Sequence, residues 1–307
     1  MQLLNLTTDH IIASLDPTKV DPWTDEAKSV WVPIIAYWIY SIAFHFLMKA
    51  EIPFIEKYRI HTSEDMAKRN RVTFSRVLLM VACQQVIQCI LGLVVITPPS
   101  DPAAVVRKQE ALVVHLTSHI HTILSFVLPH TKNTTSIAFS LAYSLYNFVW
   151  PCIQFFLAMV IMDTHQYFLH RLFHVNKFLY KHIHSHHHRL YVPYSFGALY
   201  NHPVEGFLLD TLGATIAFEL TGMSPFLGMI FFSFSNMKTV DDHCGYSFPW
   251  DPLQFFFGNN VVYHDIHHQP YGIKKNFSQP YFTFWDWLLN TQYTGPVRSN
   301  KVASKQQ

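Results

Sequence analysis

The stretch that decides the fold, residues 163–188, reads DTHQYFLHRLFHVNKFLYKHIHSHHH. It follows a long uncharged run and contains two short-spaced histidine groups, HRLFH at 170–174 and HSHHH at 184–188. Side chains four residues apart share one face of a helix, so the two histidines of the first group are predicted to converge. A third group, HDIHH at 264–268, repeats the spacing of three and four residues. Because packing gives no simple reason for three such groups, we predict a metal centre.

The predicted centre holds two metal ions on imidazole nitrogens, which zinc, copper, iron and nickel all accept. Each ligand needs an acceptor on its other ring nitrogen, and Asp163, Asp242 and Asp265 are predicted to supply it. Isolated histidines such as His61 are instead predicted to lie at a surface or interface. The ligands expected from the three groups are His170, His174, His184, His187, His188, His264, His267 and His268, with His243 and His202 as single additions.

The chain is predicted to be an all-α integral membrane protein, since half of its 307 residues are hydrophobic and only 14% are charged. Residues 31–48, 77–96 and 134–162 are long and apolar enough to cross a hydrocarbon layer of roughly 30 Å. His115, His119 and His121 interrupt the apolar residues of the range 111–130, and an interfacial helix is predicted there. We expect an N-terminal membrane region, 1–162, and a C-terminal histidine-rich region, 163–307.

Residues 207–236 form a further apolar segment, interrupted by Asp210 and Glu219. As one helix it would be roughly 45 Å long, which is too short for two full crossings. We predict a re-entrant hairpin that breaks near Gly222-Met-Ser-Pro225, and a fourth span is the alternative.

The distribution of basic residues predicts the orientation. Residues 49–76 contain seven lysines and arginines, whereas residues 98–133 contain three. The first loop should therefore be cytosolic, and the histidine-rich region should lie on the same side. A net charge of +2 without an extended basic stripe argues against a nucleic-acid partner, and four scattered cysteines indicate no disulfide framework.

At the histidine groups the sequence resembles the fatty acid hydroxylase/sterol desaturase superfamily, whose pattern is an H-X3-H box followed by two H-X2-H-H boxes. Within it, residues 184–205 and 241–252 are most similar to the sphinganine C4-hydroxylases. Some related hydroxylases have a second H-X3-H pair before the last box. Here Thr239 stands four residues before His243, so that pair is incomplete.

The resemblance implies an enzyme that uses two iron ions and O2 to hydroxylate sphinganine, as long-chain base or ceramide, at C4 to give phytosphingosine. Zinc could replace iron in purified protein. Electrons would come from NAD(P)H through a separate cytochrome b5 and its reductase, because the chain has neither a Gly-X-Gly-X-X-Gly fingerprint nor a His-Pro-Gly-Gly haem motif. The expected location is the endoplasmic reticulum membrane, with a cytosolic metal site.

Four residues of the hairpin are candidates for contact with a lipid substrate: Asp210, Glu219, Phe207 and Phe231. Ionisable groups in apolar segments are often functional, although both acidic residues could simply lie near the interface or the turn. Two alternative functions are considered. One is a sterol C4-methyl oxidase or C5-desaturase of the same superfamily, and the other is a zinc transporter or metal-storage membrane protein.

Overall fold

A computed structural model describes residues 21–95, 102–129 and 131–297. These residues form helices and connecting loops, and the described ranges contain no β-strand beyond one isolated bridge between Arg59 and Tyr246. The prediction of an all-α membrane protein is confirmed. Three helical stretches are long and apolar enough to cross a membrane: Asp25–Ala50, Phe74–Val94 and Thr134–Val175. They contain the predicted spans 31–48 and 134–162 in full. Of the predicted span 77–96, residues 77–95 lie in the second helix, and Ile96 lies outside the described residues.

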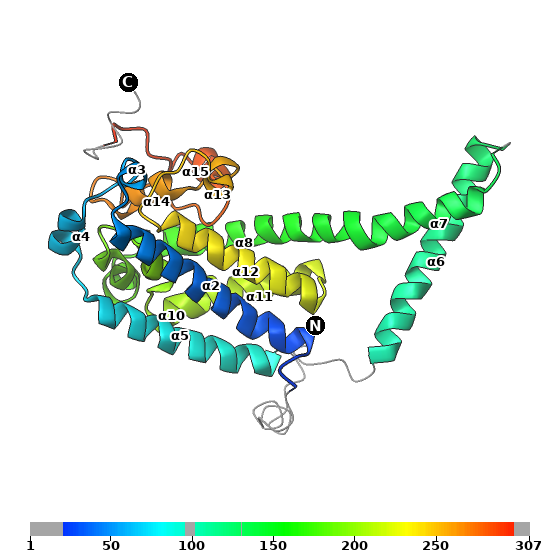
Figure 1. The fold of residues 1–307 in the computed structure, drawn as a ribbon, viewed down its shortest axis with the longest axis horizontal. Coiled ribbons are helices and arrows are strands. Elements are labelled where there is room, and N and C mark those ends of the chain that lie inside the picture. The colour runs from blue at the N-terminus through cyan, green and yellow to red at the C-terminus, as the bar shows by residue number, and fades with distance from the viewer. Residues whose placement is uncertain (1–20, 96–101, 130, 298–307) are drawn as a thin grey trace.

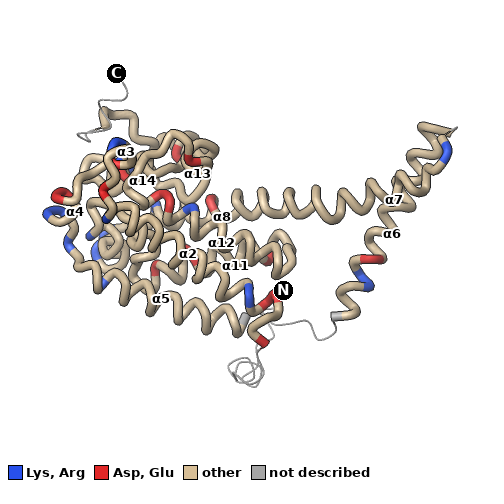
Figure 2. Tube along the Cα trace, viewed as in Figure 1, with Lys and Arg blue, Asp and Glu red and all other residues tan. Residues whose placement is uncertain are grey.

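The bundle consists of α2 (Asp25–Ala50), α5 (Phe74–Val95) and α12 (Pro225–Asp242), which lie side by side (Figure 1). α2 begins where the Thr24 hydroxyl accepts a hydrogen bond from the Ala27 amide, a typical N-cap. α2 and α12 run in the same direction along their length. Charged residues of α2 and α5 lie near the helix ends, which leaves their middle turns uncharged (Figure 2).

The third span is a long, nearly continuous helix made of α7 (Thr134–Ser144), a π-helical turn (Leu145–Val149) and α8 (Trp150–Val175). The π-turn directly precedes Pro151, where the ring and the missing N–H disturb the α-helical hydrogen bonds. α8 continues through residue 162 without a break, so the division of the chain at that residue stays a prediction.

α6 (Pro102–Val127) is the helix expected for residues 111–130. It packs against α7 and leads away from the rest of the molecule as the outer arm of a helical hairpin (Figure 1). Its placement at the membrane interface stays a prediction.

The predicted hairpin is present as a helix–turn–helix, and its re-entrant placement in the membrane stays a prediction. A π-turn (Gly206–Thr211) leads into α11 (Leu212–Thr221), and Gly222 ends that helix in the left-handed conformation, with φ of 61°. The next helix, α12, begins at Pro225 after Ser224, whose hydroxyl accepts a hydrogen bond from the Leu227 amide. α11 packs on α8 and α12 on α2, so the hairpin ties two spans together.

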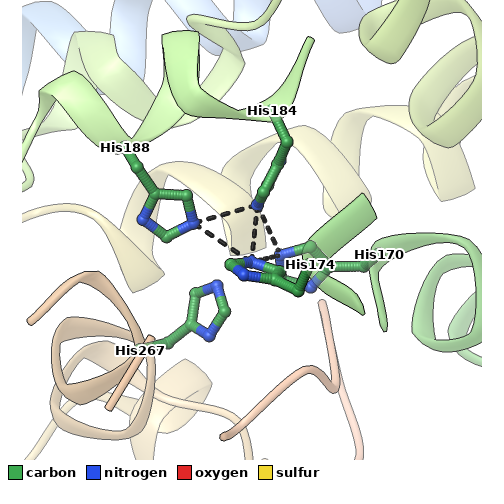
Figure 3. A group of neighbouring side chains, drawn as sticks. All are labelled: His170, His174, His184, His188 and His267. Carbon is green, nitrogen blue, oxygen red and sulfur yellow. Dashed lines mark hydrogen bonds between the residues drawn. The ribbon is translucent and has the colours of Figure 1, made fainter. Parts of the chain in front are cut away.

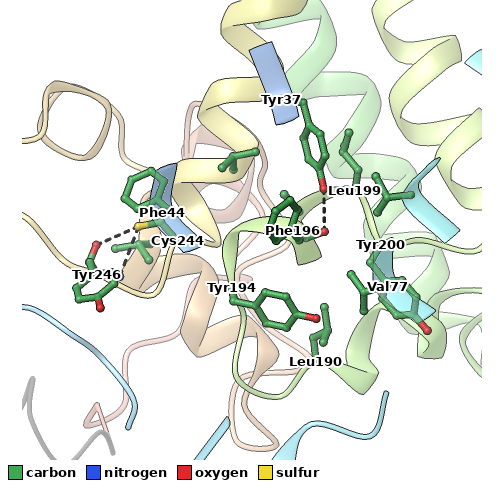
Figure 4. Packing of buried hydrophobic residues seen from close by; sticks show 14 of the residues in the cluster. Tyr37, Phe44, Val77, Leu190, Tyr194, Phe196, Leu199, Tyr200, Cys244 and Tyr246 are labelled. Carbon is green, nitrogen blue, oxygen red and sulfur yellow. Dashed lines mark hydrogen bonds between the residues drawn. The ribbon is translucent and has the colours of Figure 1, made fainter. Parts of the chain in front are cut away.

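The buried core extends from the bundle to the histidine-rich end. Tyr37 is fully buried, and its hydroxyl donates a hydrogen bond of 2.8 Å to the carbonyl of Phe196 (Figure 4). This bond holds the 3-10 turn Ser195–Leu199 against α2. Because this turn follows the second histidine group, the contact fixes that group relative to the bundle.

Short helices gather at the end where α2, α8 and α12 terminate (Figure 1). They are α3 (Pro53–Glu56), α4 (Ser63–Arg69), α9 (Lys177–His182), a 3-10 turn (His184–Arg189), α10 (Pro203–Glu205), α13 (Pro252–Phe255), α14 (Val261–His268) and α15 (Phe284–Leu288).

Candidate metal centre

The three predicted histidine boxes come from three separate elements. His170 and His174 lie one turn apart near the end of α8. The second box forms the 3-10 turn His184–Arg189, and the third ends α14, whose first turn is capped by the side chain of Asn260. All eight box histidines are buried.

The structure brings nine histidines together in two groups, and within each group the ligand nitrogens lie within 4.8 Å of one another. The group of five contains His170, His174, His184, His188 and His267, and the group of four contains His187, His243, His264 and His268. In each H-X2-H-H box, the residues four apart enter one group and the middle histidine enters the other. The two groups are therefore interlocked.

The distances between nitrogens fit ligands of a shared ion. In the group of five, Nε2 of His184 lies 2.7 Å from Nε2 of His174 and 2.9 Å from Nε2 of His188 (Figure 3). Two nitrogens bound at right angles to an ion at roughly 2.1 Å lie about 3.0 Å apart, whereas tetrahedral ligands lie about 3.4 Å apart. The spacing thus favours five or six coordination positions.

The group of four has similar spacing. Nε2 of His264 lies 3.0 Å from Nε2 of His243 and 3.1 Å from Nε2 of His268. Four histidines leave at least one of five or six positions for another ligand.

The hydrogen bonds made by Nδ1 show that the Nε2 atoms that face one another carry lone pairs. His170 and His268 each lie with Nδ1 2.8 Å from a backbone carbonyl, of Phe277 and Leu190 respectively, and the carbonyl oxygen can only accept. A neutral imidazole with its proton on Nδ1 carries a lone pair on Nε2. Lone pairs facing one another at this distance repel, and a cation between them removes the repulsion. The residues present therefore fit bound metal ions.

Burial favours the protonation state that binds metal. It lowers the pKa of His187 to about 4 and that of His267 to about 3, because the charged imidazolium loses its hydration. These rings are therefore neutral at physiological pH, which is the form in which imidazole acts as a ligand.

Comparison with known proteins agrees with this geometry. The sequence model described as fatty acid hydroxylase matches residues 155–291, which include all nine histidines. The sphingolipid C4-hydroxylase sur2 of Schizosaccharomyces pombe is 47% identical over 284 residues, 92% of this chain and 94% of that protein. The chain belongs to the fatty acid hydroxylase family. It is an oxidoreductase of that family.

Other relatives of this fatty acid hydroxylase family member differ in name or coverage. Sphinganine C4-monooxygenase 2 of Arabidopsis thaliana is 42% identical and covers 87% of this chain and 88% of its own length. The very-long-chain aldehyde decarbonylase GL1-9 of Oryza sativa subsp. indica is 39% identical, with coverage of 88% and 91%. Matches named methylsterol monooxygenase span only about half of this chain. No solved structure matches it.

The acceptor that holds His184 in this family member was not among the predicted carboxylates. His184 Nδ1 lies 2.5 Å from Oε1 of Glu205, and both side chains are 1% exposed. Glu205 begins the hairpin segment, 21 residues further along the chain. Glu205 is the last residue of the sequence NHPVE (201–205), which gave no local sign of this contact, because the contact depends on how the loop 189–202 folds back.

The three predicted carboxylates have other partners. Asp163 accepts hydrogen bonds from the amides of Tyr281 and Phe282. It lies seven residues before His170, roughly 10 Å along the helix axis, which is too far for it to reach that ring. Its contacts instead hold the loop that follows the third box.

Asp242 and Asp265 are each adjacent to a box or single histidine in sequence but point elsewhere. Asp242 pairs with the buried Lys238 and accepts a hydrogen bond from Asn259. Asp265 lies 2.8 Å from Nε2 of His61, a histidine predicted to lie at a surface or interface. Adjacent residues of a helix point about 100° apart, which explains why neither contacts the ligand next to it.

The single histidines differ from each other. His243 joins the group of four, and its Nδ1 lies 2.8 Å from the carbonyl of Thr239. The contact uses the backbone of residue 239 and not its side chain. His202 lies in neither group, since it caps α10, with its Nδ1 accepting a hydrogen bond from the Val204 amide.

Two cavities are relevant to the centre, and one of them is lined by a ligand histidine. One, of about 130 Å³, lies between α2, α5, α11 and α12 and is lined by Asp210, Phe232 and Thr239 among others. Of the other predicted substrate contacts, Phe231 is fully buried in the core and Phe207 is 41% exposed at the surface. Glu219 does not line this cavity.

The second cavity, of about 550 Å³, reaches His174 from the other side of the centre. Its lining includes three basic side chains, Arg171, Lys177 and Lys274, together with Tyr180 and Phe277. A positive approach to one metal-binding group is therefore built into this end of the molecule.

Proposed function

We propose that this enzyme hydroxylates sphinganine at C4 to give phytosphingosine, with two iron ions held by the nine grouped histidines. The observation that carries the proposal is the pair of interlocked histidine groups in a chain 47% identical to a sphingolipid C4-hydroxylase over almost its full length. In the balanced reaction, one atom of O2 enters the C4–H bond and the other leaves as water. Two electrons and two protons come from outside the chain.

The bound irons would supply the oxidising power that protein side chains lack. The residues of the chain would hold the metal ions and orient their ligands and the substrate. The carbonyls of Phe277, Tyr200 and Leu190 each accept from a ligand ring and fix its tautomer. The 130 Å³ cavity would position the substrate, because Thr239, whose carbonyl accepts from His243, is part of its lining.

We propose that electrons come from NAD(P)H through a separate cytochrome b5 and its reductase. The cavity at His174 supports this proposal, because Arg171, Lys177 and Lys274 form a positive surface where an acidic carrier can approach a metal ligand. The basic residues of the loop 49–76 are a second candidate surface. Their number is also explained by a cytosolic location of that loop.

The proposed location is the endoplasmic reticulum membrane, with the metal centre on the cytosolic side. The C-terminal ends of α2 and α8, the N-terminal end of α5 and the basic loop between α2 and α5 all lie at the histidine-rich end (Figures 1 and 2). A single orientation then places every metal ligand on one side.

The test is incubation of the purified protein with sphinganine, a reductant and 18O2, followed by mass spectrometry of the product and metal analysis of the protein. Incorporation of one 18O atom at C4 supports the proposal. If the protein instead oxidises methylated sterols, the activity named for the methylsterol monooxygenases would replace the proposal. If it converts an aldehyde to a shortened hydrocarbon, the activity named for the aldehyde decarbonylase would replace it. Protein that contains zinc alone and consumes no oxygen after loading with iron would favour metal transport or storage.

A further inference from the structure

Asp210 is a carboxylate at the start of the hairpin, and it has no basic partner among the described residues. Its Oδ2 accepts hydrogen bonds from the amide groups of Gln84, at 3.3 Å, and Asn201, at 3.2 Å. Both bonds end on the same oxygen, which leaves the acceptor capacity of Oδ1 unused by these partners. A largely enclosed carboxylate is costly without a cation, so a cationic partner from outside the chain would stabilise it.

Asp210 lines the 130 Å³ cavity. Asn201, which donates to it, directly follows Tyr200, whose carbonyl accepts from His187 at 3.1 Å. Thr239 lines the same cavity, and its carbonyl accepts from His243. Two residues whose carbonyls accept from histidines of the group of four thus lie close to Asp210: Thr239 lines the same cavity, and Tyr200 precedes Asn201, which donates to Asp210.

Gln84 shows that this polar cluster is specifically arranged. A Cβ atom at Gly206 would lie 2.3 Å from the Gln84 amide, so glycine at that position is what allows the amide to reach Asp210. The Oε1 atom of Gln84 is buried and has no hydrogen-bond partner. One turn further along α5, Gln88 donates to the Thr211 hydroxyl and also lines the cavity. The unused acceptor capacity of Asp210, which lines the cavity, matches a ligand group that only donates.

The cavity is small. Pockets that enclose a whole ligand measure roughly 300–1,000 Å³, so about 130 Å³ suits a polar head group whose tail lies outside among the helices. Its lining also includes apolar side chains, among them Ile34, Leu199 and Phe232. A small polar head with a positive charge on an apolar chain fits both parts of this lining.

We propose that Asp210 binds the protonated amino group of a free long-chain base, so that the enzyme selects sphinganine over amide-linked sphingolipids. This inference rests on the proposed function. In sphinganine the amino group is on C2, and C4 lies two bonds along the chain. A charge-assisted bond of roughly 2.8 Å to Oδ1 would hold C4 within about 7 Å of the carboxylate, on the side of the group of four. Acylation of the amino group removes its positive charge, so an amide-linked lipid would leave the Asp210 carboxylate without a cationic partner.

The test compares sphinganine with N-acetylsphinganine for the wild type and for Asp210→Asn. We expect the wild type to prefer the free base. Asp210→Asn should lower kcat/KM for sphinganine roughly 10- to 100-fold and leave that for the acetylated lipid nearly unchanged. Asp210→Glu keeps the charge and should retain part of the preference. Asp25→Asn is the matched control, because Asp25 is an exposed carboxylate at the far end of α2, and this variant should behave as wild type.

Binding of sphinganine to the metal-free protein in lipid nanodiscs provides a readout that does not depend on catalysis. Asp210→Asn should weaken it by a similar factor. Equal loss of activity with both lipids, or unchanged binding, would overturn the role of Asp210, as would a wild type that uses both lipids equally well. A wild type that binds two metal ions and hydroxylates neither lipid would overturn the proposed function itself, and the role of Asp210 with it.

Discussion

Replacing Glu205 with alanine should weaken binding of the ion held by the group of five. Glu205 is the only carboxylate among the described residues that contacts a ligand ring of the two groups, at 2.5 Å from His184 Nδ1, and both side chains are almost fully buried. Loss of such an outer partner typically lowers metal affinity 10- to 100-fold, which corresponds to about 1.4–2.7 kcal/mol. Glu205→Gln keeps an acceptor but loses the charge, and should fall between alanine and wild type.

The assay is titration of apo protein with Fe²⁺ against a chelator of known affinity, recording the occupancy of each of the two sites. Glu56→Gln is the matched control, because Glu56 bonds the Tyr246 hydroxyl and Arg59 and contacts no ligand histidine. Wild-type affinity at both sites in Glu205→Ala would refute the reasoning, since it would mean that the carboxylate does not support His184.

Three further predictions concern the centre, its electron supply and the hairpin. His187→Ala should abolish turnover while membrane insertion, followed by extraction and fractionation, is unchanged; full activity would refute its role as a ligand. Lys177→Glu combined with Lys274→Glu should slow turnover with cytochrome b5 about tenfold or more, but not with a chemical reductant, and equal rates with both donors would exclude that surface. Gly222→Ala should cost about 1 kcal/mol of stability, measured by thermal unfolding in detergent, because φ is positive although the space is open; an unchanged unfolding temperature would contradict this.

The ligand boxes could be predicted from the sequence because their spacing is a local property of the helix. His170 and His174 lie one turn apart wherever the rest of the chain goes. Likewise, the turn at Gly222 was predicted because glycine followed by Ser-Pro ends one helix and starts another.

The supports of the ligands could not be predicted because they come from distant parts of the chain. His170 uses the carbonyl of Phe277, 107 residues away, and His268 uses that of Leu190, 78 residues away. Backbone carbonyls are present at every residue, so no side-chain pattern marks them. The same holds for the division of ligands between the groups, which depends on how the second and third boxes face each other.

The interlocking of the boxes has a consequence for assembly of the centre. His187 and His188 are consecutive yet belong to different groups, and so are His267 and His268. An ion that orders one group thereby fixes the backbone of both boxes and prepares the other group for its own ion. Loading should therefore be cooperative, so that protein with a single ion is scarce and the enzyme is found either empty or complete.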